Sequence, residues 1–238
     1  MKRHLKKLLS NLGWRISREP RGVVVGQDLW HDLGVLLGTS PLCFDVGANH
    51  GDVSEALLQL RPTARIHAFE PGTTCQAKLK KRFGSDPRLT VIASGLGDQA
   101  GESEFRNYAN DQLSSFLPLQ TSESNPFRAE REIVSDRVAI TTVDRYCADH
   151  GLASVDLLKI DTQGYDLRVL KGGEKLFGAA GVRYVLVELN FISLYEGQPW
   201  GHEVIAWLHQ HGLDLVDFYE KCRRDQRLAW CTALFAKT

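Results

Sequence analysis

Residues 43–51 read Cys43-Phe44-Asp45-Val46-Gly47-Ala48-Asn49-His50-Gly51. In this stretch an apolar run ends at an acid and passes into a glycine-rich turn, and a helix-forming segment, 52–60, comes next. A second short apolar run, 66–69, then ends at Glu70. The order strand, tight turn, helix and strand with a closing acid is typical of α/β folds that hold an adenosine-containing cofactor at the carboxyl ends of parallel strands.

The chemistry of the turn indicates which cofactor to expect. Gly47 and Gly51 can take positive φ values, so a ligand can approach the backbone closely. A dinucleotide enzyme would place a pyrophosphate there with the pattern G-x-G-x-x-G, but here Asp45 precedes the first glycine and Asn49 replaces the middle one. A carboxylate at that point would repel a pyrophosphate and suit a cofactor with a cationic amino-acid end, while Glu70 can accept hydrogen bonds from both hydroxyls of a ribose. We therefore expect S-adenosylmethionine rather than NAD.

Apolar runs alternate with helical segments along the rest of the chain. We expect strands near 42–46, 65–69, 89–94, 155–160, 183–189, 213–219 and 228–236. We expect helices near 52–60, 73–83, 164–177 and 201–211. This alternation predicts an α/β fold in which a mostly parallel sheet carries helices on both faces. The polar link 220–226 suits a hairpin, so the last strand should be antiparallel to its neighbours.

One domain with an insertion is the simplest organisation. We place the domain at 41–238, after a basic helix and lead-in at 1–40, and the insertion at 100–142. Within the insertion, Glu104–Tyr108 and Arg137–Thr142 have the pattern of short strands. The polar segment 110–135 between them is interpreted as a lid, because loops of this length inside a compact domain are usually functional or disordered.

The N-terminal segment is amphipathic and basic. Its apolar residues fall on one face of a helix: Leu5, Leu8, Leu9, Leu12 and Ile16. Residues 1–22 carry seven Lys and Arg against one acid, within a chain of net charge zero. Two interpretations stay open: a helix packed on the domain, or a surface helix in which 1–18 rests on an acidic membrane or partner.

Two compositional features bear on the cellular compartment. The apolar runs near the N-terminus are too short for a signal peptide core or a membrane span. The five cysteines are odd in number and scattered, without metal-ligand or redox-motif spacing, which favours reduced thiols. We therefore expect a cytoplasmic protein, with peripheral contact to the inner face of the membrane as an option.

Several blocks together resemble the signatures of the FkbM-type methyltransferases. The longer blocks are 44–51, Phe69-Glu70-Pro71 and 158–164, and the shorter ones are Thr142-Val143-Asp144, 169–172 and Val187-Glu188. The resemblance runs from about residue 42 to about 215. It implies an S-adenosylmethionine-dependent O-methyltransferase with the class I, Rossmann-like sheet. Members are similar to enzymes that methylate hydroxyls on sugars, glycans and polyketide-type products.

The resemblance also implies a set of cofactor residues. Carried over by position, the residues lining the methionine end of the cofactor would be Asp45, Gly47, Ala48, Asn49 and Gly51. Glu70 would hold the ribose, and Asp98, after the third strand, would lie near the adenine. Asp161 would approach the cofactor from the neighbouring strand.

The catalytic residues are expected where strand 155–160 ends beside the first strand. Asp161 is the first candidate for a general base or for orienting the acceptor hydroxyl. Lys159, two residues earlier, and Glu188, on the next strand, are the other catalytic candidates. Either Lys159 or Asp161 could equally be a member of a structural ion pair.

Substrate contacts are expected on the segments that follow these strand ends. Gln163 and Gly164 open the next helix and should face the acceptor, together with Asn190. We expect no metal; were Mg²⁺ to take part, its oxygen ligands would be Asp161, Glu188 and Asn190. Further acceptor contacts are expected from the lid, through Asn110, Ser114 and Ser115, and from an aromatic wall made by Phe191, Tyr195 and Trp200.

Three alternatives carry weight. An NAD-dependent oxidoreductase is disfavoured by Asp45 and by the missing middle glycine. A catalytically silent cofactor-fold module could instead bind a partner through the basic N-terminal helix. Nucleic-acid methylation is disfavoured because the chain beyond its N-terminus is net acidic and has no basic stripe interleaved with aromatic residues. The partner expected is a small-molecule or glycan hydroxyl acceptor, and the oligomeric state is open, a homodimer included.

Overall fold

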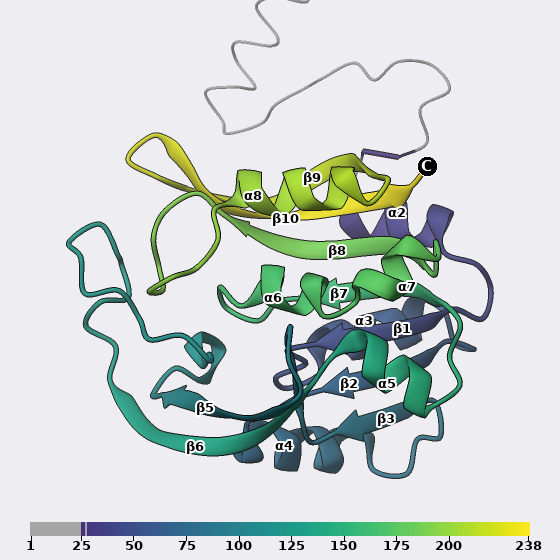
Figure 1. The fold of residues 1–238 in the computed structure, drawn as a ribbon, viewed down its shortest axis with the longest axis horizontal. Coiled ribbons are helices and arrows are strands. Elements are labelled where there is room, and N and C mark those ends of the chain that lie inside the picture. The colour runs from purple at the N-terminus through teal and green to yellow at the C-terminus, as the bar shows by residue number, and fades with distance from the viewer. Residues whose placement is uncertain (1–24, 27) are drawn as a thin grey trace, which may run out of the picture.

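The computed structural model describes residues 25–26 and 28–238, so the predicted N-terminal helix lies outside the described residues. Its centre is a sheet of seven strands in the order β3-β2-β1-β7-β8-β10-β9 (Figure 1). The strands are β1 Leu42–Val46, β2 Arg65–Phe69, β3 Leu89–Ile92, β7 Val155–Ile160, β8 Val182–Asn190, β9 Leu213–Arg224 and β10 Arg227–Lys237. The first five in space are parallel, and β10 is antiparallel to both β8 and β9. The predicted sheet and its antiparallel last strand are confirmed.

The middle of the sheet is buried on both faces. All five residues of β1 are buried, and so are all but one of the residues of β7. Continuous burial of this kind is expected where parallel strands are covered by helices on both sides. The carboxyl ends of β1 and β7 lie side by side because Val46 pairs with Ile160.

Helices cover both faces (Figure 1). One face carries α2 Leu29–Leu36, α3 Asp52–Leu60 and α4 Thr73–Phe83. The other carries α5 Val143–Asp149, α6 Asp166–Lys171, α7 Glu174–Gly178 and α8 Gly201–Gln210. Helices α2 and α5 were not predicted, although Asp28 and Thr142 cap them in the usual way by accepting from the backbone N–H three residues ahead. Because α2 packs Leu29 and Leu33 into the core, part of the predicted lead-in belongs to the domain.

The predicted helix 164–177 is two short helices, α6 and α7. The break falls at Gly172, where a Cβ atom would collide with the carbonyl oxygen of Gly97. The Gly172 carbonyl also accepts a hydrogen bond from Asp144 N at 2.9 Å. Three chain segments therefore meet at this glycine, and the helix ends there.

The insertion forms a second, smaller sheet. Its strands are β4 Gly95–Leu96, β5 Gly101–Tyr108 and β6 Glu132–Thr141, in the order β4-β6-β5, so the two predicted strands are present but longer. The segment between β5 and β6 contains the short 3-10 helix η1 Asp111–Leu113 and has a small core of its own: Tyr108, Leu113, Leu119, Leu194 and Tyr195. This core explains how a polar segment keeps a fixed shape.

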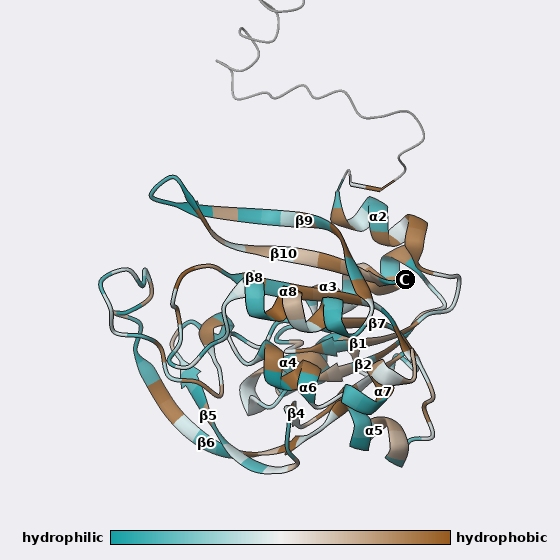
Figure 2. Cartoon of the chain, turned by 45° about the horizontal axis from the view of Figure 1, so that its top comes forward, coloured by the Kyte–Doolittle hydropathy of each residue, from teal (hydrophilic) through white to brown (hydrophobic). Residues whose placement is uncertain are grey.

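The β9–β10 hairpin is longer than predicted. Its turn is only Asp225-Gln226, with φ values of 46° and 64°, as expected for a two-residue turn that matches the twist of the strands. The tip is hydrophilic (Figure 2). Among the helices in the described ranges, none combines the length and the apolar character needed to cross a membrane.

Candidate functional site

Two neighbouring cavities lie at the carboxyl ends of the parallel strands. The loop cavity encloses about 340 Å³ and is lined by the glycine-rich loop, Glu70 and η1. The hairpin cavity encloses about 180 Å³ and lies against α2, β8 and the β9–β10 hairpin. Lys159, Asp161 and Glu188 line both cavities. The three predicted catalytic residues therefore stand at the junction between them.

The glycine-rich loop has a shape that few side chains would allow. Gly47 has a φ of 74°, and a Cβ atom there would collide with the carbonyl oxygen of Asp161. The N–H groups of Gly47 and Ala48 both donate to the carbonyl of Phe69, at 3.0 and 3.1 Å. Asn49 takes a φ of 47°, which asparagine tolerates better than most residues. The loop is thus held against the ends of β2 and β7, with its backbone open to the cavity.

A buried ion pair supports the loop from below. Lys159 Nζ lies 2.8 Å from Asp45 Oδ1, and their side chains are 7% and 0% exposed. Ser54 Oγ donates to the other carboxylate oxygen of Asp45 at 2.6 Å, and Lys159 Nζ also donates to the Gly47 carbonyl at 2.9 Å. Asp45 does not line the loop cavity. The expectation that its carboxylate faces a cationic ligand, and so repels a pyrophosphate, therefore loses its basis.

Lys159 keeps its charge despite its burial. Burial works against the ammonium, but the carboxylates of Asp45 and Asp161 outweigh it and hold the Lys159 pKa above its ordinary value. An ammonium group of this kind cannot accept a proton near neutral pH. Of the two interpretations left open by the sequence, the structure favours Lys159 as a structural ion-pair member.

Glu70 is arranged to receive a ligand with two donors. It accepts from Asn49 N through Oε2 and from Gly72 N through Oε1, each at 2.8 Å. Burial raises the pKa of Glu70 against the opposing effect of these two backbone hydrogen bonds. A carboxylate has about four lone-pair sites, so about two are left for a ligand in the cavity that it lines.

Asp161 is oriented by a chain of side chains. Gln163 Nε2 donates to Asp161 Oδ1 at 2.7 Å, and the Tyr195 hydroxyl donates to Gln163 Oε1 at 3.0 Å. Gln163 has a φ of 53° and lines the loop cavity. Its side chain thus connects the small core of the insertion to the acid at the cavity junction.

Glu188 is a largely buried acid with a raised pKa. Burial, followed by the charges of Asp161 and Asp166, holds its pKa well above the ordinary glutamate value. Asn190 Nδ2 donates to Glu188 Oε1 at 3.1 Å. A carboxyl group with a raised pKa at the junction of two cavities is suited to taking a proton from a ligand.

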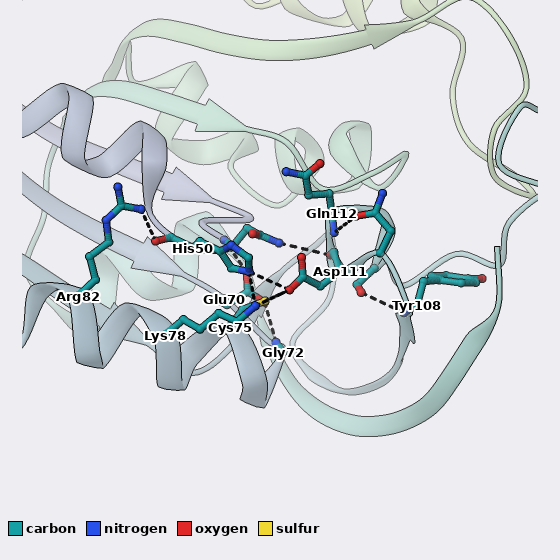
Figure 3. A network of polar contacts seen from close by, with 12 residues as sticks. His50, Glu70, Gly72, Cys75, Lys78, Arg82, Tyr108, Asp111 and Gln112 are labelled. Atoms are coloured by element: carbon teal, nitrogen blue, oxygen red, sulfur yellow. Dashed lines mark hydrogen bonds and ion pairs between the residues drawn. The ribbon is translucent and has the colours of Figure 1, made fainter.

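The insertion is fastened across the loop cavity by Asp111 (Figure 3). Asp111 Oδ2 lies 2.8 Å from both His50 Nε2 and Lys78 Nζ. The Asp111 carbonyl accepts from Asn49 Nδ2 at 3.3 Å. These contacts, which we call the Asp111 latch, join η1 to the glycine-rich loop and to α4.

The comparisons with known proteins agree with this geometry. The family described as the methyltransferase FkbM domain matches residues 45–215. The chain belongs to the FkbM methyltransferase family. It is 27% identical over 164 residues to the 2-O-methyltransferase NoeI of Sinorhizobium fredii. The alignment covers 66% of this chain and 67% of that protein. It is 30% identical over 209 residues to the 31-O-demethyl-FK506 methyltransferase FkbM of Streptomyces tacrolimicus. That alignment covers 77% of this chain and 76% of the relative.

A solved relative shows the same fold. The crystal structure of a methyltransferase FkbM from Methylobacillus flagellatus superposes with a TM-score of 0.53 at 15% identity, and the match covers 83% of this chain and 44% of that chain. At this identity the likeness is one of fold. This protein is therefore a methyltransferase built on the predicted class I, Rossmann-like sheet.

The methyltransferase brings most of its predicted site residues together, with exceptions among the cofactor residues. Gly47, Ala48, Asn49 and Glu70 line the loop cavity as a group, together with Asp161. Asp98 does not line it: it is exposed, because the preceding Gly97 packs between Ile140 and Tyr165 and the chain turns outward. Gly51 faces away, toward Leu79 and Phe83 of α4, so its positive φ serves helix packing.

The predicted substrate residues separate in the same way. Gln163 lines the loop cavity, but Gly164 is buried against Tyr195 and Gln198 and lines neither cavity. Asn190 is 4% exposed and also lines neither, so its visible role is to position Glu188. The alternative magnesium set is not assembled at either cavity, because Asp161 and Glu188 line both cavities while Asn190 lines neither.

The insertion lines one of the cavities, whereas the predicted aromatic wall lines neither. Ser114 and Phe116 of the insertion line the loop cavity, not the hairpin cavity, while Ser115 is buried and donates to the Gln163 carbonyl at 2.8 Å. Tyr195 is 1% exposed inside the small core of the insertion, and Trp200 is 45% exposed. Neither residue lines a cavity, and the same is true of Phe191.

Some residues of the site were missed by reasoning from the sequence. Asp111 and Phe116 belong to a polar insertion without a motif, and Trp30 and Trp230 lie near opposite ends of the chain. No local pattern brings these positions together. The one usable signal was Asp28, an N-cap residue that indicates the start of α2, the helix that carries Trp30.

Proposed function

We propose that this methyltransferase transfers a methyl group from S-adenosylmethionine to a hydroxyl of a sugar, a glycan or a polyketide-type acceptor. The observation that carries the proposal is the loop cavity, which joins an open glycine-rich backbone to a buried Glu70 and ends at two carboxyl groups. The names of two relatives support transfer to oxygen, since one is a 2-O-methyltransferase and the other acts on 31-O-demethyl-FK506.

The residues of the loop cavity fit such a donor. Gly47, Ala48 and Asn49 line the cavity, and Glu70 retains acceptor sites for a pair of ribose hydroxyls. Bound there, S-adenosylmethionine supplies an electrophilic methyl group on a sulfonium. Thr162 and Gln163 also line this cavity, and the Asp111 latch holds η1 at its edge.

The chemical step needs alignment and a proton acceptor. The acceptor oxygen would take the methyl group and leave the donor as a neutral thioether, so the hydroxyl proton would have to be accepted by the protein. Glu188, with Asp161 beside it at the junction, takes that proton. Alignment of this kind supplies on the order of 7–11 kcal/mol in favourable cases, and a positioned base adds roughly 10²–10⁴-fold.

Calorimetric titration with S-adenosylhomocysteine tests the donor, with NAD titrated in parallel. We expect S-adenosylhomocysteine alone to bind. Glu70→Gln should weaken binding by about tenfold, because a charged acceptor to two hydroxyls is lost. Asp98→Asn, on the exposed turn outside the cavity, is the matched control and should bind normally.

Each other outcome has a definite meaning. Binding of NAD alone would replace the proposal with a nicotinamide enzyme. Donor binding without turnover on any hydroxyl acceptor would favour a catalytically silent partner-binding module. Equal weakening by Glu70→Gln and Asp98→Asn would show that Asp98 contacts the cofactor, as the sequence predicts.

A further inference from the structure

The hairpin cavity has a composition unlike that of the loop cavity. Its aromatic walls are Trp30 of α2 and Trp230 of β10, and its apolar floor includes Leu186. Its polar groups are Lys159, Thr232 and three carboxyl groups from different strands or strand ends: Asp161, Glu188 and Glu220. Flat apolar walls with a few convergent polar groups are the usual composition of a small-molecule site.

The size of the hairpin cavity limits what can enter. At about 180 Å³ it is smaller than the loop cavity and below the roughly 300 Å³ at which sites for drug-sized ligands begin. One ring with its hydroxyl groups is a suitable occupant, whereas a macrocycle could present only an edge.

The charge of the cavity is one-sided. Among the described residues Lys159 is the one cation lining it, and Asp45 already balances that charge in the buried ion pair. The remaining charged groups, Asp161, Glu188 and Glu220, are acids. A phosphate or carboxylate on the occupant would meet like charges in a partly enclosed space, while hydroxyl or ammonium groups would find acceptors.

Glu220 is held in this cavity by a strained backbone. Between the pairs Trp230–Cys222 and Thr232–Tyr219, two residues, Glu220 and Lys221, stand opposite Cys231, which defines a β-bulge. Glu220 has a φ of 46°, in the region where glycine is the ordinary choice at a bulge. Such strain at a non-glycine residue is typical of functional positions.

The Glu220 carboxylate has capacity left for a ligand. Thr232 Oγ1 donates to Glu220 Oε2 at 2.9 Å and fixes the side chain. Within the described part of the chain, Oε1 has no hydrogen-bond partner. Glu220 is exposed and lines the cavity, so its second carboxylate oxygen is available to accept from a ligand there.

We propose that the hairpin cavity binds a single uncharged or cationic sugar ring of the acceptor, and that Glu220 selects this ring by accepting a hydrogen bond from it and repelling anionic rings. This inference rests on the proposed function, because the ring must present its hydroxyl at the junction of Asp161 and Glu188. It assigns the acceptor to the hairpin side, where none of the substrate residues predicted from the sequence lies.

Saturation-transfer NMR on the complex with S-adenosylhomocysteine tests the proposal directly. The probes are the methyl glycosides of glucose, fucose, glucosamine and glucuronic acid. We expect the neutral and amino sugars to bind and the glucuronide to be excluded. In Glu220→Gln the affinity for the bound sugars should fall by about tenfold, because a hydrogen bond to a charged acceptor is weakened, and the discrimination against the glucuronide should shrink.

Two further variants separate recognition from structure. Asp225→Asn removes a charge from the same hairpin at another positive-φ position outside the cavity and should bind sugars like the wild type. Glu220→Gly should raise the melting temperature by relieving the strained backbone while still losing sugar affinity. If the role of Glu220 were only structural, the Glu220→Gly variant would not show a higher melting temperature together with a lower sugar affinity.

The outcomes distinguish this inference from the proposed function. If S-adenosylhomocysteine binds but no sugar does, or if the glucuronide binds as well as the neutral sugars, the hairpin-cavity proposal is overturned and the methyltransferase assignment stands. If sugar binding is unchanged in Glu220→Gln, the role of Glu220 is overturned. Failure to bind S-adenosylhomocysteine would count against the proposed function itself.

Discussion

At the scale of single residues, the Lys159 ammonium connects three parts of the site. It contacts the carboxylate of Asp45, the carbonyl of Gly47 and, by charge, the acid at the cavity junction. The ion pair is buried, so neither charge can be solvated if its partner is removed. We therefore regard Lys159 as a positioning residue that holds the glycine-rich loop in place.

Replacement of Lys159 should destabilise the fold before it affects chemistry. Lys159→Met leaves Asp45 buried and unpaired, which costs about 3–5 kcal/mol in comparable cases. Asp45→Asn combined with Lys159→Met removes both charges and should recover much of this loss, since the asparagine can still accept from Ser54. Urea denaturation of the two variants checks this, and equal stability in both would show that the unpaired Asp45 charge is not the cause of the loss.

Glu188 is the residue on which proton transfer should depend. Glu188→Gln is expected to lower turnover by roughly 10²–10⁴-fold, with S-adenosylhomocysteine affinity retained. Because the pKa of Glu188 is raised, wild-type turnover should be present above that raised pKa and be lost as the pH falls through it, at a higher pH than for an ordinary glutamate. Glu196→Gln, an exposed acid on the loop after β8, is the control. An active Glu188→Gln beside an inactive Asp161→Asn would assign the base to Asp161.

At the scale of elements, features marked by local sequence signals could be predicted, and features that depend on long-range contacts could not. The strands around Asp45 and Glu70 are mostly apolar and have marked ends, so the sequence predicted them almost residue by residue. The break at Gly172 could not be predicted, because it depends on Gly97 in a distant turn. Likewise Lys159, the buried partner of Asp45, lies 114 residues further along the chain. The direction in which the Asp45 carboxylate points could therefore not be predicted from the sequence.

At this scale, we expect loss of the Asp111 latch to weaken cofactor binding. Partial burial opposes the Asp111 charge, yet hydrogen bonds from Lys78 and His50 hold its pKa below the ordinary value. The carboxylate, and with it the latch, is therefore present above that pKa and is lost only as the pH falls through it. The latch should stay fastened at neutral pH.

Asp111→Asn should loosen the insertion without unfolding the domain. Since the latch is partly exposed, we expect S-adenosylhomocysteine to bind only about two- to fivefold more weakly, the effect of about 0.5–1 kcal/mol. The dissociation rate should rise more than the association rate falls. Glu123→Gln, an exposed acid of the same insertion, should behave like the wild type, and stopped-flow measurement of both variants would show no difference if the latch were idle.

At the scale of the whole molecule, acids gather along one edge of the sheet. Glu70, Asp161 and Glu188 lie at or near the carboxyl ends of parallel strands. Asp166 opens the helix that follows β7, and its charge acts on Glu188. A common edge is a consequence of topology, because each parallel strand ends on the same side. Bringing these acids together causes electrostatic repulsion between them. Burial already disfavours their ionised forms, so the two effects add.

That repulsion should be visible in the pH dependence of stability, most clearly through Asp166. Asp166 accepts from Thr162 N and Gly164 N, and burial raises its pKa to about 6. A raised carboxyl pKa gives stability that is present below the unfolded value, near 4, and is lost as the pH rises through about 6.

Asp166→Asn removes this titration, although it also loses one acceptor for the turn at Thr162–Gly164. We expect the wild type to lose up to about 3 kcal/mol relative to the variant between pH 4 and pH 7, the equivalent of about two pKa units. Urea unfolding of both proteins across this range measures the difference directly. His67, whose pKa burial lowers, titrates equally in both proteins and cancels. Parallel stability curves would mean that the pKa of Asp166 is the same in the folded and unfolded protein, so that its contacts with the turn offset its burial.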